Sequence, residues 1–326
     1  MTAIWRTQQM PRRLSGSLSA LAIWLLLGAL DGQAQQPSAA APAGPRADAP
    51  AEVTRECPTV RDYAAFYACA LERIKTFKTS RRTRDGRPDL NGMWSATRIA
   101  QDIEDVKAGQ YGAMGSMRTL IVDPADGKIP YQPWARQPRK DGETRWVSPT
   151  ALCVPVGAVR WSYSPVSVTG HRIIQQPREI IFSMERLHTY RTIPLNNTRR
   201  LASNVKLWQG ESRGRWEGET LVIETTNLTD KVWFDHIGTF MSDEIKMEER
   251  ISYVDQDTLL YVATYTDPKV FTQPWKIAKG LLRAPAQGMD ALDLEDTTVE
   301  GCDETIAHLF GAGQRPFTGL GLVLPK

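Results

Sequence analysis

The chain has 326 residues, with 40 Lys or Arg and 37 Asp or Glu, which gives a formal net charge of +3. Residues 1–34 hold three of the arginines and one aspartate, so the remainder carries 37 basic and 36 acidic residues, a net charge of +1. This balance argues against nucleic acid as a partner, because binding it needs a concentrated basic face.

The N-terminus has the pattern of an export signal. Three arginines among the first 13 residues precede the apolar run LSALAIWLLLGAL (18–30), and small residues follow it, which predicts cleavage near Ala34. The 13-residue run is shorter than the roughly 20 residues of a membrane-spanning helix. We therefore expect a periplasmic or secreted protein with no membrane span after signal removal. A retained anchor is the alternative, and both general and twin-arginine export stay open.

The rest of the chain divides into a linker and one domain. Residues 35–56 are rich in Ala and Pro without apolar periodicity, which predicts a disordered linker. Residues 57–326 are long enough for a single domain with a sizeable core. Its first part has apolar residues at spacings of three and four, which predicts an N-terminal helix over about 62–78.

The four cysteines fit an oxidising compartment. In one continuous helix Cys57 and Cys69 would lie about 18 Å apart, whereas a disulfide needs Cα atoms roughly 4.4–6.8 Å apart. If Asp62 caps the helix, the stretch before it can fold back beside the first turns. We predict a Cys57–Cys69 disulfide and a second one between Cys153 and Cys302. Free thiols or another pairing are the alternatives.

Strand patterns dominate after the helix, without long helical segments between them. This favours a mainly β fold, an antiparallel meander that closes into a barrel or rolled sheet, over a parallel α/β sheet. The expected strands cover 117–124, 170–176, 178–193, 204–210, 220–227, 244–254, 258–266 and 274–284.

Two features of these strands predict what lies inside the barrel. Glu249 interrupts an alternating apolar row, and a carboxylate facing the interior costs several kcal/mol unless it is paired. It therefore lines a wet cavity or lies opposite an Arg. Tyr261 is in the row expected across from it, and Trp216 is expected to cover the barrel end. We take all three as candidate ligand-binding residues.

The run SRGRWEGETLVIETTN (212–227) contains Gly218 at the tight position of a short connection, beside Trp216 and a β-branched strand. The run is either a binding motif or a hairpin. Hairpin chemistry already accounts for these residue types.

The candidate catalytic residues lie in two segments. If 178–193 is one long strand, alternation puts Glu185 and Arg191 on one face and His188 on the other, and a bulge would bring all three inward. They would supply an acid–base group and an anion clamp; the alternative is a solvated strand. The second candidate is the pair Asp235 and His236, expected in a loop at the barrel mouth.

We expect no metal and no cofactor. The four histidines lack the short spacing of a metal-binding helix, and no thiolate accompanies them. G-x-S-x-G, G-x-G-x-x-G and the P-loop are all absent, which disfavours α/β-hydrolases, dinucleotide enzymes and NTPases.

Three stretches carry a family likeness: GESRGRWEGETLVIETTNLTDKVWFD (210–235), ERISYVDQDTLLYVATYTDPKVFTQPW (249–275) and IVDPADGKIPYQP (121–133). They resemble a large family of exported bacterial proteins that are mostly uncharacterised. The resemblance implies the same fold and an exported location, but no reaction. Where family members often carry His, this chain has Met241 and Lys246, and Asp303 replaces a His or Glu after the last Cys. The triplet GMW is also similar to the start of lipocalin-like barrels.

Two function classes remain, both with a small-molecule ligand. The first is a cofactor-independent acid–base enzyme, such as a lyase, isomerase or hydrolase, acting in a barrel cavity. It requires a titrating His and an essential Glu or Arg. The alternative is a non-catalytic binding or carrier protein for an apolar or aromatic ligand, which needs the cavity and its aromatic side chains but no acid–base pair.

Overall fold

The computed structural model describes residues 57, 63–96, 103–104, 119–149, 154–155, 157–163, 171–184, 189–195, 199–235, 237–283 and 315–316. All of these lie within one compact unit, residues 50–326. In the described residues, no helix is both long and apolar enough to cross a membrane.

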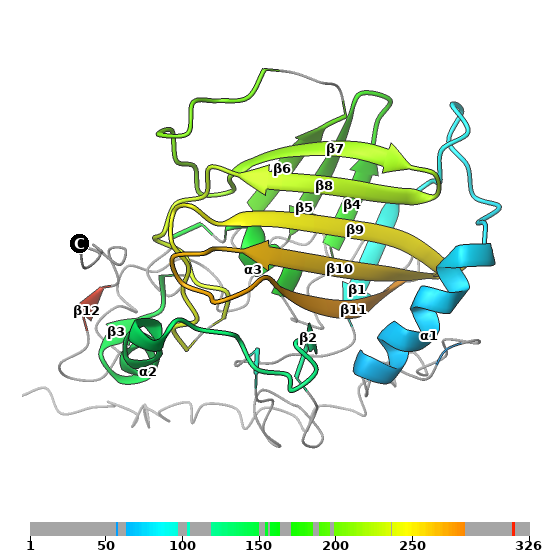
Figure 1. Cartoon of the computed structure of the whole chain (residues 1–326). Helices are drawn as coiled ribbons and strands as arrows, with labels where there is room; N and C mark the ends of the chain where they lie inside the picture. The colour runs from blue at the N-terminus through cyan, green and yellow to red at the C-terminus, as the bar shows by residue number, and fades with distance from the viewer. Residues whose placement is uncertain are drawn as a thin grey trace, which may run out of the picture. The chain divides into compact units, whose positions relative to one another are not determined.

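Ten strands of the described residues form one antiparallel sheet (Figure 1). The order along its main path is β6-β5-β4-β1-β11-β10-β9-β8-β7, and β2 pairs with β11 off this path. The strands are β1 (Gly92–Ala96), β2 (Ile121–Asp123), β4 (His171–Gln175), β5 (Glu179–Met184), β6 (Thr189–Pro194), β7 (Glu211–Glu217), β8 (Thr220–Thr226), β9 (Lys246–Asp255), β10 (Thr258–Thr266) and β11 (Trp275–Arg283).

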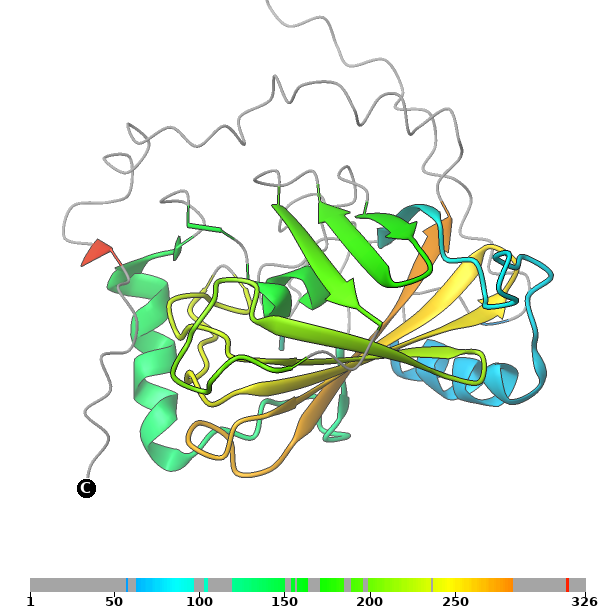
Figure 2. The ribbon, with the colours of Figure 1, turned by 90° about the horizontal axis from the view of Figure 1, so that it is seen from above.

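The sheet consists of two meanders joined by β1, which pairs with β11 on one side and β4 on the other. Strands β7 to β11 form the first meander and β4 to β6 the second, and the strong twist is visible from above (Figure 2). This confirms the predicted mainly β fold. The placement of β1 between the meanders gives the sheet a more complex order than a single meander.

The sheet nearly closes into a barrel where its end strands β6 and β7 meet through side chains. A Cβ atom on Gly214 of β7 would lie 2.7 Å from Cδ2 of Leu195 and 2.9 Å from Cγ2 of Ile193. We call this contact between β6 and β7 the seam. Only a glycine lets the two strands approach this closely.

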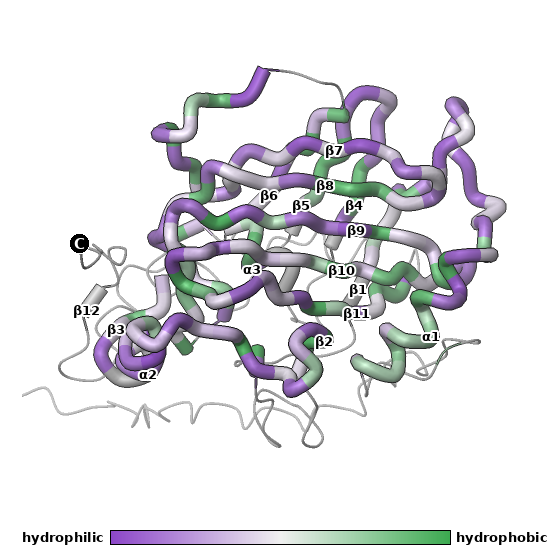
Figure 3. Tube along the Cα trace, in the orientation of Figure 1, coloured by the Kyte–Doolittle hydropathy of each residue, from purple (hydrophilic) through white to green (hydrophobic). Residues whose placement is uncertain are grey.

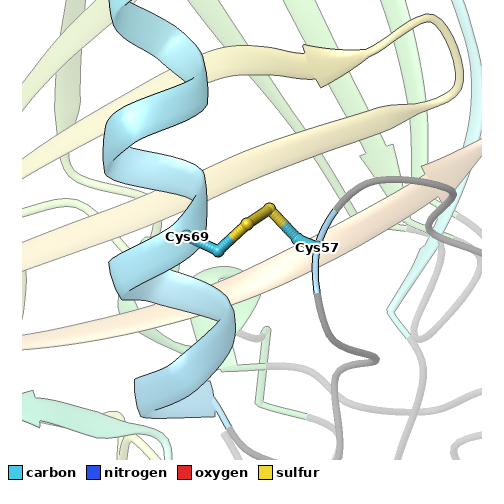
Figure 4. Close-up of a disulfide and its surroundings, with 2 residues drawn as sticks. All are labelled: Cys57 and Cys69. Atoms are coloured by element: carbon cyan, nitrogen blue, oxygen red, sulfur yellow. A yellow bond between two sulfur atoms is a disulfide. The ribbon is translucent and has the colours of Figure 1, made fainter.

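Helix α1 (Tyr63–Thr76) packs across β9 and β11 and buries Tyr63, Phe66 and Ala70. The helix begins at Tyr63, which is the start expected if Asp62 is its N-cap. Cys57 forms a disulfide with Cys69 of the helix, with Cα atoms 5.7 Å apart (Figure 4). The first predicted pairing is therefore present, while Cys153 and Cys302 lie outside the described residues.

The run 212–227 is a hairpin. Strands β7 and β8 pair in register from Glu211↔Thr226 to Glu217↔Thr220, and the two residues between them form the turn. Gly218 opens this turn with φ +59°, a conformation that favours glycine. Figure 3 shows mostly hydrophilic residues along β7 and a hydrophobic stretch in β8, and Arg215 of β7 pairs with Glu217 and Glu224.

Two predicted strands are wrong. The run 178–193 forms two antiparallel strands, β5 and β6, with Met184 paired to Thr189. A 16-residue strand exceeds the usual 3–10 residues, but the sequence between β5 and β6 has no Gly, Pro or Asn to mark a break. The run 204–210 is an irregular segment with one isolated bridge, Leu207↔Leu228. Its apolar Val205, Leu207 and Trp208 are exposed, so no buried face fixes a strand there.

The stretches that carry the family likeness pack against each other as core. Phe234 lies 4.7 Å from Tyr265 and 5.3 Å from Trp275 between ring centroids, and Tyr265 and Trp275 are cross-strand partners with centroids 4.5 Å apart. Aromatic contacts at these distances stabilise a fold beyond the area that they bury. The segments of these stretches that contain Phe234, Tyr265 and Trp275 therefore stabilise the core.

Candidate functional site

Four strands place polar side chains in the interior of the sheet: Arg191 from β6, Glu249 from β9, Tyr261 from β10 and Lys279 from β11. Their exposed fractions are 3%, 0%, 0% and 3%. Lys and Glu are almost never so buried unless they are paired. We call these four residues the interior cluster.

Arg191 and Glu249 form a bidentate ion pair. Nη1 of Arg191 donates to Oε2 of Glu249 and Nη2 donates to Oε1, both at 2.8 Å. The ring of Phe182, the β5 partner of Arg191, lies 5.2 Å from the guanidinium carbon. Glu249 thus lies opposite an Arg, which is one of its two predicted environments. Because the pair joins β6 to β9, it also links the two meanders across the interior.

Tyr261 extends the ion pair into a chain of hydrogen bonds. Its hydroxyl donates to Oε1 of Glu249 at 2.6 Å. Burial raises the pKa of Tyr261 well above 10, and the negative charge of Glu249 raises it further. The phenol therefore stays protonated near neutral pH and acts as a hydrogen-bond donor to the carboxylate.

Lys279 lies beside Tyr261, with Nζ 5.0 Å from the centroid of the Tyr261 ring. Burial lowers the pKa of Lys279 from 10.5 to about 7, and the charge of Glu249 only partly opposes this shift. An amine with such a pKa exchanges its proton close to neutral pH, which is the range in which a general acid or base works best.

Trp216 belongs to the same cross-strand row as the Tyr261–Lys279 pair. Successive partners run from Trp216 through Leu221 and Ile251 to Tyr261 and Lys279. Trp216 is half-buried and packs against the core. Its β7 strand lies at the end of this row, and its role as a cover of the interior stays a prediction.

Asp235 has a different environment. It is fully buried, and its Oδ1 accepts hydrogen bonds from the backbone N–H groups of Ile237 at 3.1 Å and Thr239 at 3.0 Å. The Thr239 hydroxyl donates to Oδ2, and Arg160 of helix α3 (Ala158–Tyr163) donates to the Asp235 carbonyl. These contacts favour a role in holding its own loop.

The remaining candidate residues, Glu185, His188 and His236, lie outside the described residues. Since β5 and β6 are separate strands, the alternation along a single strand does not place Glu185 and Arg191 on one face. The carboxylate that pairs with Arg191 in the structure is Glu249.

Sequence reasoning missed Lys279, although the sequence carries a signal for it. The alternating row Trp275, Ile277, Lys279, Leu281 on β11 is apolar except at the Lys, just as Glu249 interrupts its own row. A charged residue inside an otherwise apolar row predicts a buried polar group.

Among the described residues, no group of three or more His, Cys, Asp and Glu side chains could hold a metal ion. Comparisons of the chain with models of protein families, with curated proteins and with solved structures find no match in any of the three.

Proposed function

We propose that this is an exported small-molecule-handling protein whose interior cluster performs cofactor-independent acid–base chemistry. The observation that carries the proposal is the amine of Lys279, which is buried against Tyr261 and has a pKa of about 7. The lyases, isomerases and hydrolases that work without a cofactor need a group of this kind to move a proton.

Each member of the interior cluster has a separate role in this proposal. Lys279 takes or returns the proton, and the Tyr261 phenol, whose single O–H is donated to Glu249, places its ring beside the amine. The Arg191 ion pair holds Glu249, which in turn orients the Tyr261 hydroxyl.

Export is supported by the N-terminal signal pattern and by the Cys57–Cys69 disulfide. Disulfides persist in the periplasm and outside the cell and are rare in the cytosol. The family likeness of the hairpin segment has the same implication.

The experiment is hydrogen–deuterium exchange at carbon. The protein is incubated in D2O with a panel of small aldehydes, ketones and esters, and loss of the proton next to the carbonyl is followed by NMR. We expect one or more compounds to exchange faster than in buffer, and this acceleration to disappear in Lys279→Met.

The matched control is Lys276→Met. Lys276 is on the same strand but is partly exposed and paired with Asp123 at 2.7 Å, so its loss should leave the exchange rate unchanged. Exchange that survives in Lys279→Met, or a panel without any protein-dependent exchange, would contradict the acid–base function.

A second candidate is a non-catalytic carrier for an apolar or aromatic ligand. The full burial of Glu249 and Tyr261 favours it, because a hydrogen-bonded cluster can fix the shape of an interior without reacting. Native mass spectrometry of the purified protein separates the two candidates. A carrier retains a ligand in both the wild type and Lys279→Met, and neither form accelerates exchange.

A further inference from the structure

A pocket of about 680 Å³ lies beside helix α2 (Arg136–Thr144), away from the interior cluster. We call it the α2 pocket. The described residues around it include four basic side chains: Lys128, Arg136, Arg139 and Lys140. Tyr131 also lines it, and Pro124, Ile129 and Pro130 supply apolar surface.

The positive charge of the α2 pocket is poorly neutralised. Lys128, Arg136 and Lys140 are exposed and make no ion pair with any carboxylate in the described part of the chain. Arg145, which directly follows the helix, behaves differently, since it pairs with Asp141 at 3.0 Å. Three unpaired cations around one concave surface favour an anionic ligand.

The two acidic residues that line the α2 pocket are engaged with backbone. One oxygen of Glu104 accepts the N–H of Ile129 at 2.6 Å, and Oδ1 of Asp126 accepts the N–H of Lys128 at 3.0 Å. Four basic and two acidic residues leave the α2 pocket with an excess of two positive charges.

Tyr131 supplies a hydrogen-bond donor without an acceptor. The residue is 5% exposed, and its hydroxyl is buried with no hydrogen-bond partner. The Thr239 hydroxyl lies close enough to influence the pKa of Tyr131, and its own proton is donated to Asp235, while its lone pairs receive no hydrogen bond from the described residues. Burial raises the pKa of Tyr131 above 10, so the phenol keeps its proton. A buried donor left unbonded is unfavourable, so an acceptor that reached it from the pocket would stabilise the site.

The wall of the α2 pocket is fixed in place. Nη1 of Arg139 donates to the carbonyl of Ile237 at 3.0 Å. Gly142 lies so close to Gly238 that an added Cβ would be 2.6 Å from the Gly238 Cα. Helix α2 is therefore held against the Asp235 loop, and little ordering would be needed on binding.

We propose that the α2 pocket is a binding site for a small carboxylic acid with an apolar or aromatic body. The carboxylate accepts hydrogen bonds from the Tyr131 hydroxyl and the basic side chains, and the body lies against Pro124 and Pro130. This site does not depend on the chemistry of the interior cluster.

The test is calorimetric titration of the full mature chain with benzoate, benzamide and inorganic phosphate. We expect benzoate to bind at least about tenfold more tightly than benzamide, because the neutral amide has the same shape but loses the charge-assisted bonds. Its affinity should also fall as salt is raised. Arg136→Gln, Lys140→Gln and Tyr131→Phe should each weaken benzoate binding.

Arg145→Gln is the matched control, since it removes a positive charge directly after the helix, outside the α2 pocket, and should leave benzoate binding unchanged. The exposed positions of Arg136 and Lys140 keep the test valid even if Tyr131→Phe alters folding. Equal binding of benzoate and benzamide, binding of phosphate alone, or variants that bind like the wild type would each overturn the proposal.

Discussion

Among single residues, Arg191 has the largest expected effect on stability. Replacing it by Met leaves the carboxylate of Glu249 buried without its cation, which costs roughly 3–5 kcal/mol. A denaturant melt of Arg191→Met measures the loss. Arg200→Met is the control: its pair with Glu224 is about half exposed, so the change should stay within about 0.5 kcal/mol.

A double replacement separates charge from packing at this site. Arg191→Met combined with Glu249→Leu removes both charges, and we expect it to recover most of the lost stability. If Arg191→Met is no more destabilising than Arg200→Met, the ion pair is not a buried contact in solution.

The pKa of Lys279 predicts a pH dependence of stability. Folding lowers this pKa from 10.5 to about 7, so between these values the unfolded chain binds a proton that the folded chain does not. The free energy of unfolding therefore rises with pH in this window, with a slope approaching about 1.4 kcal/mol per pH unit from this group.

The measurement compares the wild type with Lys279→Met by denaturant unfolding from about pH 7 to about pH 9.5. The difference between them should change steadily in favour of the wild type as the pH rises. Lys276→Met should show a flat difference over the same range, because the pKa of Lys276 is raised above 10.5 by its bond to Asp123. A flat difference for Lys279→Met would show that the folded protein keeps this lysine charged.

Glu249 and Arg191 differ in how far the sequence alone predicts their place in the site. The break in the alternating row predicts that Glu249 is buried, because strand periodicity is local. Its partner Arg191 is 58 positions away along the chain. Only the arrangement of β6 opposite β9 brings the two together, and no local pattern contains that information.

At the scale of elements, Gly214 decides how β6 and β7 meet. A Cβ there would overlap Leu195 and Ile193, so we expect Gly214→Ala to cost about 1–3 kcal/mol through overpacking. Adding Leu195→Ala should return part of this loss, a coupling that denaturant melts of the single and double variants measure.

Gly218→Ala is the comparison within the same hairpin. No atom lies within 4 Å of the added Cβ, so its cost comes from the positive φ alone and should not change with Leu195→Ala. Strictly additive effects of Gly214→Ala and Leu195→Ala would mean that the seam is looser than this packing implies.

The bounds of a strand can be predicted from the sequence where turn-forming residues separate it from the next strand. The strand expected at 258–266 agrees with β10, and the turn near Gln256 separates it from β9. The run 178–193 has strong strand propensity, and residues 185–188 include no Gly, Pro, Asn, Asp or Ser, so the break into β5 and β6 has no local sequence signal. The error matters because alternation along the supposed single strand would have paired Arg191 with Glu185.

At the scale of the whole molecule, composition and strand density are enough to predict a mainly β fold that curls on itself. The insertion of β1 between β4 and β11 is not predictable in the same way, because it joins segments more than 180 positions apart (Trp94↔Arg283). Such long-range pairing depends on global packing rather than on local propensity.

The last prediction concerns processing and oxidation of the complete chain in a bacterial host. We expect the exported protein to begin at Gln35, because Ala34 provides the small residue that precedes a signal-peptide cleavage site. N-terminal sequencing measures this, and a bulky residue in Ala34→Phe should impair cleavage near this site.

Export also exposes the chain to an oxidising compartment, so thiol titration of the denatured, unreduced protein should find Cys57 and Cys69 oxidised. Arg12→Lys with Arg13→Lys distinguishes the routes, since only twin-arginine export should fail in that variant. Exported protein that retains Met1, or free thiols at both cysteines, would contradict the prediction.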